Sequence, residues 1–234
     1  MLERKIVEAE KIIAFTPFRN ISQELIEDVQ EHSRAIALNA DEPLFRQDEP
    51  ARRSYFCLTG AMKLFRLTPA GSEKIFHIAT AGDTLFDSIS IRADRTYPVH
   101  CIAMEATEVM SMDIDFLLQM LDRSQRARMD LVDSLIGRAD DLLCHAELLS
   151  VDKASFRVSS FLLEEYRNNG NIPHFRLRYS KKNIASFLSL QPETLSRCLR
   201  VLRDEGIANS NARDIEILDP ARLEQMVCGG QSAT

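Results

Sequence analysis

The spacing of hydrophobic residues changes twice along this chain of 234 residues. Residues 20–33 form a predicted amphipathic helix, in which Leu25, Ile26 and Val29 make the apolar stripe and Ser22 suits the N-cap. From about residue 36 to 112 the pattern predicts short strands separated by turn residues, at 36–38, 43–45, 55–58, 61–67, 74–78, 97–103 and 108–112. Many short strands at near-regular spacing favour a small antiparallel barrel or roll.

A helical period returns near residue 129. The apolar residues spaced 3-4-3-4-3, as in helices that pair, are Met129, Val132, Ile136, Ala139, Leu143 and Ala146. Leucines at 135, 142 and 149 widen this stripe. A helix that lies only on its own domain needs one stripe, whereas this helix has enough apolar surface for the barrel and a second copy. We therefore expect a homodimer, with residues 152–154 as a candidate hinge.

Residues 154–234 predict a helix at 154–169, a strand at 175–179, two short helices and a hairpin at 207–218. Ser180 suits the N-cap of the first short helix, whose Ile184, Ala185 and Leu188 face inward. The second begins at Pro192, where the missing N–H costs nothing, and ends at Gly206. Its predicted buried residues are Leu195, Leu199 and Leu202. Two short helices and a hairpin in this order are typical of a winged helix-turn-helix.

The charge is unevenly distributed. The net charge is −6, but residues 150–234 hold 12 basic against 10 acidic residues. Between 176 and 203 there are seven basic residues and one acid, Glu193. A local basic stripe on an acidic body is typical of a DNA-binding module. No apolar run is long enough to span a bilayer and the N-terminus has no signal-peptide pattern, so we expect a cytoplasmic protein without a membrane partner.

The second short helix carries the candidate base contacts Glu193, Ser196 and Arg197. Arginine offers a bidentate fork to guanine, and a carboxylate accepts from cytosine N4, so Arg197 and Glu193 suit a G·C pair and its neighbour. A solvated salt bridge between the two, four residues apart, is the structural alternative. The candidate phosphate contacts are Lys181, Lys182, Thr194, Arg200 and Arg213.

The order of these parts resembles the Crp–Fnr superfamily of bacterial transcription regulators over nearly the whole chain. The matching features are the turns at 58–60 and 81–83, the long helix and the run Pro192-Glu-Thr-Leu-Ser-Arg197. The resemblance implies an α+β fold with an antiparallel, cyclic-nucleotide-binding-like β-roll at 1–120, a dimerisation helix at 121–150 and a winged helix-turn-helix at 151–234. It also implies a non-enzymatic homodimer that binds inverted-repeat DNA with TTGA-like half-sites about 34 Å apart, a thymine contact for Ser196 and RNA polymerase as a partner.

The run Gln191-Pro-Glu-Thr with Asp204-Glu-Gly-Ile resembles the branch of the family that responds to nitric oxide and nitrosative stress. Cyclic-AMP binders of the family hold the phosphate with an Arg-Ser pair and a Gly-Glu, which align here with Tyr97-Pro98 and Phe86-Asp87. Without that arginine and serine, the anion is poorly neutralised and cyclic AMP is not expected. An iron–sulfur cluster is not expected either, because the first of five scattered cysteines is Cys57. These thiols are predicted to be reduced and mostly buried.

Haem remains as the expected cofactor. Its candidate axial ligands are His145, His77, His100 and Met62, although none lies in a dedicated haem motif. The predicted effector pocket contains Phe76, Leu85, Phe86 and Tyr97, an apolar set that also suits an ordinary core. Two alternatives are open. One is the same fold gated by another small molecule or a redox signal, and the other is a sensor whose helix-turn-helix is only structural. An enzyme using Cys144 and His145 is not expected, because adjacent residues on a helix point in different directions and no third orienting group is evident.

Overall fold

The computed structural model describes residues 6–69, 71–85, 95–150, 153–177 and 179–230. They divide into an N-terminal unit, Met1–Asp140, and a C-terminal unit, Asp141–Thr234. Helix α4, Gln125–Ser150, contributes to both units. The boundary between the units falls inside the region 121–150 that the sequence predicts as the dimerisation helix, and the residues of α4 before it belong to the unit of the roll.

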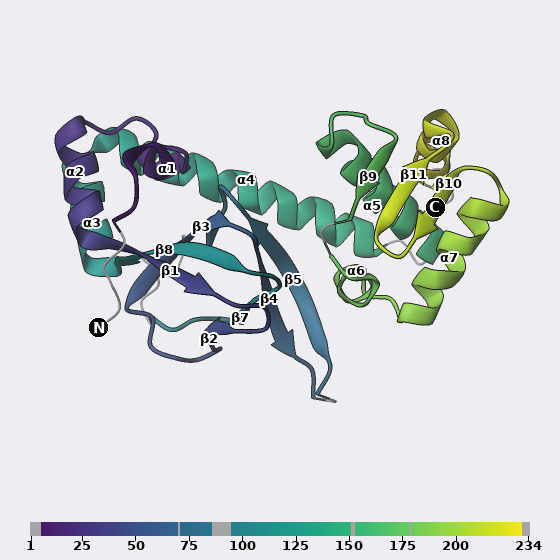
Figure 1. The fold of residues 1–234 in the computed structure, drawn as a ribbon, viewed down its shortest axis with the longest axis horizontal. Coiled ribbons are helices and arrows are strands. Elements are labelled where there is room, and N and C mark those ends of the chain that lie inside the picture. The colour runs from purple at the N-terminus through teal and green to yellow at the C-terminus, as the bar shows by residue number, and fades with distance from the viewer. Residues whose placement is uncertain (1–5, 70, 86–94, 151–152, 178, 231–234) are drawn as a thin grey trace. The chain divides into compact units, whose positions relative to one another are not determined.

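The N-terminal unit is a β-roll of two four-stranded antiparallel sheets, which confirms the predicted fold class (Figure 1). One sheet has the order β1-β8-β3-β6 and the other β2-β7-β4-β5. The strands are β1 Ser33–Leu38, β2 Pro43–Phe45, β3 Arg53–Thr59, β4 Ala61–Leu67, β5 Glu73–Thr80, β6 Thr84–Leu85, β7 His100–Ala103 and β8 Thr107–Asp113. The predicted strand at 97–103 begins only at His100, because Pro98 has no N–H to donate to a ladder.

The space between the two sheets is filled by apolar side chains. This core includes Leu38, Phe45, Cys57, Met62, Leu64, Cys101 and Val109. Burial raises the pKa of the Cys57 thiol to about 12, so this sulfur stays protonated at neutral pH. Cys57 and Cys101 are buried as predicted, Cys198 is half-buried and Cys144 is exposed. The side chain of Cys228 lies outside the described residues.

A second core lies between the outer face of the β1-β8-β3 sheet and four helical segments. These segments are α1 Ala9–Ile13, the 3-10 turn η1 Thr16–Phe18, α2 Gln23–His32 and α3 Ile114–Arg123. Phe15 and Phe18 pack against Phe56 of β3, with ring centroids 5.2 and 5.1 Å apart. The Ser22 hydroxyl accepts the Leu25 N–H at 3.3 Å, which confirms the predicted N-cap of α2. The segments α1, η1 and α3 were not among the predicted elements.

Helix α4 packs on the roll along one side only. Ala127 and Leu131 are buried in the second core and Leu135 packs against it. Arg138 donates to the carbonyl and the hydroxyl oxygen of Thr84 on β6. The predicted dimer stripe lies on the uncovered side, where Met129 is 51%, Val132 45%, Ile136 55% and Leu143 63% exposed. Ala139 and Ala146 are exposed as well.

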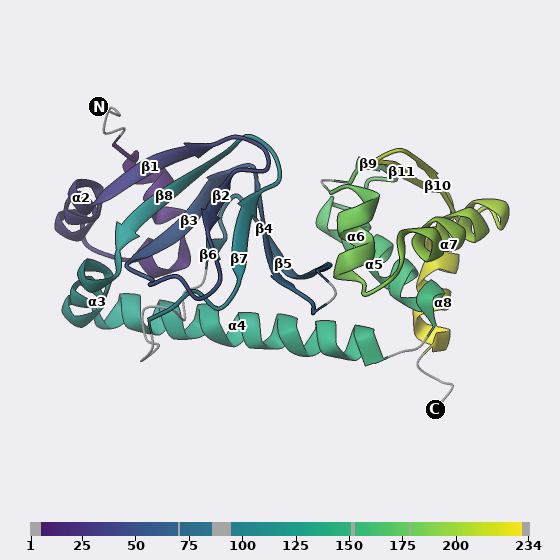
Figure 2. The same cartoon turned by 90° about the horizontal axis from the view of Figure 1, so that it is seen from below.

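The C-terminal unit consists of helices around a small sheet of order β10-β11-β9 (Figure 2). Its elements are α5 Ala154–Asn168, β9 His174–Arg176, α6 Lys181–Phe187, α7 Pro192–Asp204, β10 Ala208–Asn211, β11 Asp214–Ile217 and α8 Pro220–Gly230. These elements confirm the predicted winged helix-turn-helix, to which the structure adds α8. None of the helices in the described ranges has the length and hydropathy to cross a bilayer.

Gly60 gives a direct test of how tightly the roll is packed. Its φ is 80°, and an added Cβ would lie 2.4 Å from Thr107 Oγ1 and 2.7 Å from the Ala106 carbonyl oxygen. Gly60→Ala should lower the free energy of unfolding by about 3 kcal/mol, through left-handed strain and overpacking. Gly71→Ala is the matched control, since φ is 78° and no atom beyond the neighbouring residues lies within 4 Å of the added Cβ.

The control should cost only about 1–2 kcal/mol. Urea unfolding followed by circular dichroism measures both variants. Equal losses would contradict the close packing of the turn against Thr107.

Candidate nucleic-acid interface

Local signals in the sequence set the start and end of α7. Pro192 occupies the first turn and Gln191 is the N-cap residue. At the other end Gly206 has φ 70°, and the Ile207 N–H donates to the Leu202 carbonyl at 2.9 Å. This bond closes the helix as a Schellman-type cap. The predicted bounds of the helix, Pro192 and Gly206, are confirmed to within a residue or two.

The turn between α6 and α7 is held by backbone bonds and by one arginine. Ser180 caps α6 through its hydroxyl, which accepts the Asn183 N–H at 3.2 Å. In the turn Ser189 has φ 52°, and the Leu190 N–H donates to the Ala185 carbonyl at 2.8 Å. Arg157 of α5 donates from Nη1 to the Leu188 carbonyl at 2.9 Å. Sequence reasoning missed Arg157, because nothing local marks a contact across 31 residues.

Three leucines hold α7 in the core of the C-terminal unit. Leu195, Leu199 and Leu202 are 1%, 6% and 2% exposed, as the sequence predicts. They pack with Ile184, Ala185 and Leu188 of α6 and its turn, which are also buried. Since successive residues of a helix are rotated by about 100°, this packing turns positions 193, 196, 197 and 200 away from the core.

The side chains opposite these leucines form an exposed polar face. Glu193, Ser196, Arg197 and Arg200 are all exposed. In the part of the chain that the structure describes, neither Glu193 nor Arg197 has an ion-pair or hydrogen-bond partner, so the predicted alternative of a salt bridge between them is not formed. Thr194 differs from the expectation of an exposed residue: it is half-buried, because it lies beside Leu195 at the edge of the packed side.

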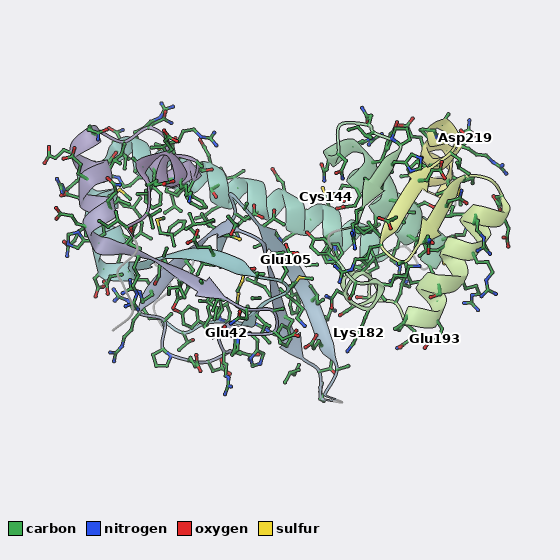
Figure 3. All side chains as sticks on the ribbon, viewed as in Figure 1. Glu42, Glu105, Cys144, Lys182, Glu193 and Asp219 are labelled. Carbon is green, nitrogen blue, oxygen red and sulfur yellow. The ribbon has the colours of Figure 1, made fainter. Side chains whose placement is uncertain are left out.

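Basic residues surround this polar face on neighbouring elements. Lys182 at the start of α6 is exposed and Lys181 is half-buried. Figure 3 shows Lys182 and Glu193 projecting from α6 and from the start of α7 at the lower edge of the C-terminal unit. Arg213 is exposed in the turn between β10 and β11, which is the wing. The arrangement offers donors and acceptors on one helix face with cations beside it.

The predicted effector pocket is only partly assembled among the described residues. Leu85 and Tyr97 are buried, and the Tyr97 hydroxyl donates to the Arg53 carbonyl at 2.8 Å. Phe76 is 36% exposed and is not part of this core. The reason is a β-bulge: β4 pairs Leu64 with His77 and Phe65 with Ile75, which leaves Phe76 unpaired and turned outward. Phe86 and Asp87 lie outside the described residues.

The candidate haem ligands belong to both units: His77, His100 and Met62 lie in the N-terminal unit and His145 in the C-terminal unit. His77 and Met62 lie on neighbouring strands, with Met62 fully buried. The Nδ1 atom of His100 lies 3.4 Å from the Gln47 N–H nitrogen, and its ring stacks on Phe65 with centroids 5.2 Å apart. His145 belongs to the C-terminal unit, where its ring lies 4.4 Å from that of Phe187.

The chain thus combines a β-roll with a helix-turn-helix whose second helix carries a polar, unpaired outer face. Two family models match it: the cyclic nucleotide-binding domain over residues 35–124 and the Crp-like helix-turn-helix domain over residues 156–226. These findings define a DNA-binding transcription regulator with an effector-binding roll. The chain belongs to the Crp/Fnr family of such regulators.

Curated relatives and solved structures agree with this assignment. The transcriptional activator protein anr of Pseudomonas aeruginosa is 29% identical over 204 residues, covering 85% of this chain and 82% of that protein. The cyclic AMP receptor protein of Thermus thermophilus is 27% identical, over 80% and 85% of the two chains. The structure of FixK2 from Bradyrhizobium japonicum matches with a TM-score of 0.75 and 26% identity, over 83% and 96%.

Proposed function

We propose that this protein is a homodimeric regulator that binds an inverted-repeat DNA site and whose DNA affinity is set by an effector in the β-roll. The observation that carries the proposal is the outer face of α7. Glu193 and Arg197 lie one helical turn apart, both are exposed, and both lack a partner among the described residues. A helix-turn-helix that served only as structure would have no need for unpaired charges at this place.

The outer face of α7 has the chemistry for reading base edges in the major groove. The Arg197 guanidinium can donate two hydrogen bonds to guanine O6 and N7, and the Glu193 carboxylate can accept from cytosine N4. Ser196, one residue before Arg197, suits a neighbouring thymine. These contacts fit a TTGA-like half-site, the half-site expected from the family resemblance.

The basic residues around α7 suit the phosphate backbone. Lys182, Arg200 and Arg213 are exposed on α6, α7 and the wing. Lys181 and Thr194 are half-buried and can reach a phosphate only from the edge of the packed side. Phosphate contacts fix the position of the protein on the duplex but do not select its sequence. RNA polymerase is the partner through which such a regulator would act.

The dimer is supported by the uncovered side of α4. Its exposed apolar residues Met129, Val132, Ile136 and Leu143 follow the spacing of paired helices. A monomer would leave this stripe in water, which is the usual sign of an interface. A second copy with two-fold symmetry buries each stripe against its equivalent and places two α7 helices on one inverted repeat.

The proposed effector is nitric oxide. Resemblance to the nitrosative-stress branch favours nitric oxide sensed through haem. Tyr97, which stands where cyclic-AMP binders have arginine, is buried and hydrogen-bonded to the Arg53 carbonyl, so it adds no cation for a phosphate. The residues that would hold a haem iron are His77, His100 or Met62 of the N-terminal unit, or His145 of the C-terminal unit.

An absorbance spectrum after addition of haem tests the haem proposal. Stoichiometric binding should give a Soret band that shifts when nitric oxide is added, because the absorbance of haem depends on the axial ligands of its iron. His77→Ala and His100→Ala would then show which histidine holds the iron. A spectrum identical to that of free haem would remove haem from the proposal and leave the DNA-reading part untouched.

Arg197→Ala should weaken binding to an inverted TTGA repeat by about 5- to 150-fold, the range for losing one bidentate base contact. The variant should also discriminate less against a substituted G·C pair. Fluorescence anisotropy with labelled duplexes measures both effects. Exposed positions on folded helices tolerate alanine, so the stability of the variant should stay near that of the wild type.

Lys182→Ala is the matched control for a phosphate contact. It should weaken binding to all duplexes alike and lower the slope of log affinity against log salt by about one. If Arg197→Ala behaved in the same way as Lys182→Ala, Arg197 would be a phosphate contact. Full, specific binding by Arg197→Ala would remove Arg197 from the interface.

Ile136→Asp should convert the dimer to a monomer, because it places a charge in the middle of the apolar stripe. Cys144→Asp is the matched control, since Cys144 is exposed on the same helix but outside the stripe. Analytical ultracentrifugation should show the monomer mass for the first variant and the dimer mass for the second. If both variants were dimers, or both were monomers, the assignment of this stripe as the dimer interface would be contradicted.

A further inference from the structure

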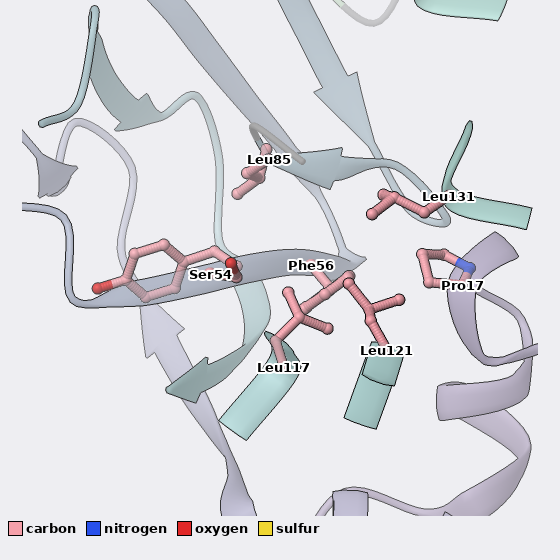
Figure 4. A pocket seen from close by; sticks show the side chains of 8 residues that line it. Pro17, Ser54, Phe56, Leu85, Leu117, Leu121 and Leu131 are labelled. Atoms are coloured by element: carbon pink, nitrogen blue, oxygen red, sulfur yellow. The ribbon is translucent and has the colours of Figure 1, made fainter. Parts of the chain in front are cut away.

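Strand β3 turns alternate side chains to the two faces of its sheet. Phe56 faces the covering helices, where it lines a small apolar pocket together with Leu117 (Figure 4). Cys57 belongs to the core between the two sheets, so Tyr55 and Arg53, two and four residues before it, lie on that inner face. Along β3, the inner face of the sheet therefore ends in an arginine.

Arg53 is half-buried and bonded to the neighbouring strand β8. Its Nε donates to the Ser111 hydroxyl and its Nη2 to the Ser111 carbonyl at 3.1 Å. Ser111 is fully buried, so these two bonds hold the guanidinium in place. Among the described residues no carboxylate forms an ion pair with Arg53. Asp113, opposite Arg53 in the ladder, instead accepts the Asp115 and Phe116 N–H groups at the start of α3.

A second arginine, Arg34, lies on the other side of Ser111. Arg34 pairs directly with Ser111 in the β1·β8 ladder, so both arginines are on the same face of the sheet. Arg34 is exposed, and in the part of the chain that the structure describes it has no hydrogen-bond or ion-pair partner. The pKa of Arg53 is lowered by burial and by the positive charge of Arg34. Two like charges held at one place are unfavourable unless an anion lies between them.

We propose that Arg34 and Arg53 bind a phosphate group between them, as inorganic phosphate or as a phosphate monoester. A phosphate group carries up to two negative charges and at least three acceptor oxygens, so it can neutralise both guanidinium groups and accept hydrogen bonds from each. A carboxylate has only one charge for two cations. The donors are the Nη1 atom of Arg53, which Ser111 does not use, and the guanidinium of Arg34. The site is independent of the proposed DNA contacts and of haem.

The charge of the surroundings favours a small anion over an acidic protein. The N-terminal unit, residues 1–140, holds 17 basic and 23 acidic residues. A broad acidic surface is repelled by a unit of the same sign, whereas a single phosphate group contacts only the two arginines. Arg53 is also partly below the surface, where a small anion reaches it more easily than the side chain of a partner protein does.

Nuclear magnetic resonance of the arginine side chains tests the site on the full-length protein. Inorganic phosphate is added at constant ionic strength, with sodium chloride making up the difference. The Nε–H signals of Arg34 and Arg53 should shift to saturation. The signal of Arg19 should not, because this exposed arginine follows η1 on the helix-covered face of the sheet. Glycerol 3-phosphate in a second titration shows whether the monoester or the free ion binds more tightly, and either order supports the proposal.

Arg34→Gln should weaken phosphate binding by about 10- to 150-fold, the loss expected for one hydrogen bond between charged groups. The variant should fold, because Arg34 is exposed and holds no other residue among those described. Arg19→Gln is the matched control and should bind phosphate as the wild type does. Equal affinity in the two variants, or shifts that chloride alone reproduces, would overturn the proposal. Tighter binding of a hexaglutamate peptide than of phosphate would overturn it in favour of a docking surface for an acidic protein.

Discussion

Burial of the leucine side of α7 is the constraint on which the DNA-reading surface depends. Leu195, Leu199 and Leu202 are held in the core of the C-terminal unit, and a helix can turn only one side toward its core. The polar side is therefore presented as one rigid surface. The position of this polar surface along the helix axis is set at the N-terminal end of α7. Pro192 begins the helix there, and Arg157 holds the preceding turn through a hydrogen bond to the Leu188 carbonyl. A shift of the helix start or of the turn would move Glu193 and Arg197 together, because both lie on α7.

Helix α4 follows the same physical rule with a different outcome. Ala127 and Leu131 use one side of the helix to cover the roll, yet Met129, Val132 and Ile136 remain exposed on the other. A single roll cannot cover both sides of a straight helix. A movement of one side moves the other, because residues that contact the roll alternate along α4 with residues of the exposed stripe. Arg138, bonded to Thr84 at the start of β6, ties this helix to the roll beyond the last buried contact.

Features with local signals were predictable from the sequence, and features that depend on distant contacts were not. The caps Ser22 and Ser180, the helix start at Pro192 and its end at Gly206 all act within a few residues. The contact of Arg157 with the turn joins residues far apart, and no spacing rule marks it. Phe76 was predicted to line a pocket, but strand alternation does not reveal the bulge that turns it outward.

We propose that Arg197 reads guanine through the major groove. Replacing the half-site guanine by 7-deazaguanine removes the N7 acceptor and leaves Watson–Crick pairing intact. If Arg197 donates to N7, this replacement should weaken wild-type binding about fivefold, the effect of losing about 1 kcal/mol from one hydrogen bond. It should leave the affinity of Arg197→Ala unchanged, because that variant has no donor to lose. An equal loss in both proteins would contradict the assignment and place the contact to N7 on another residue.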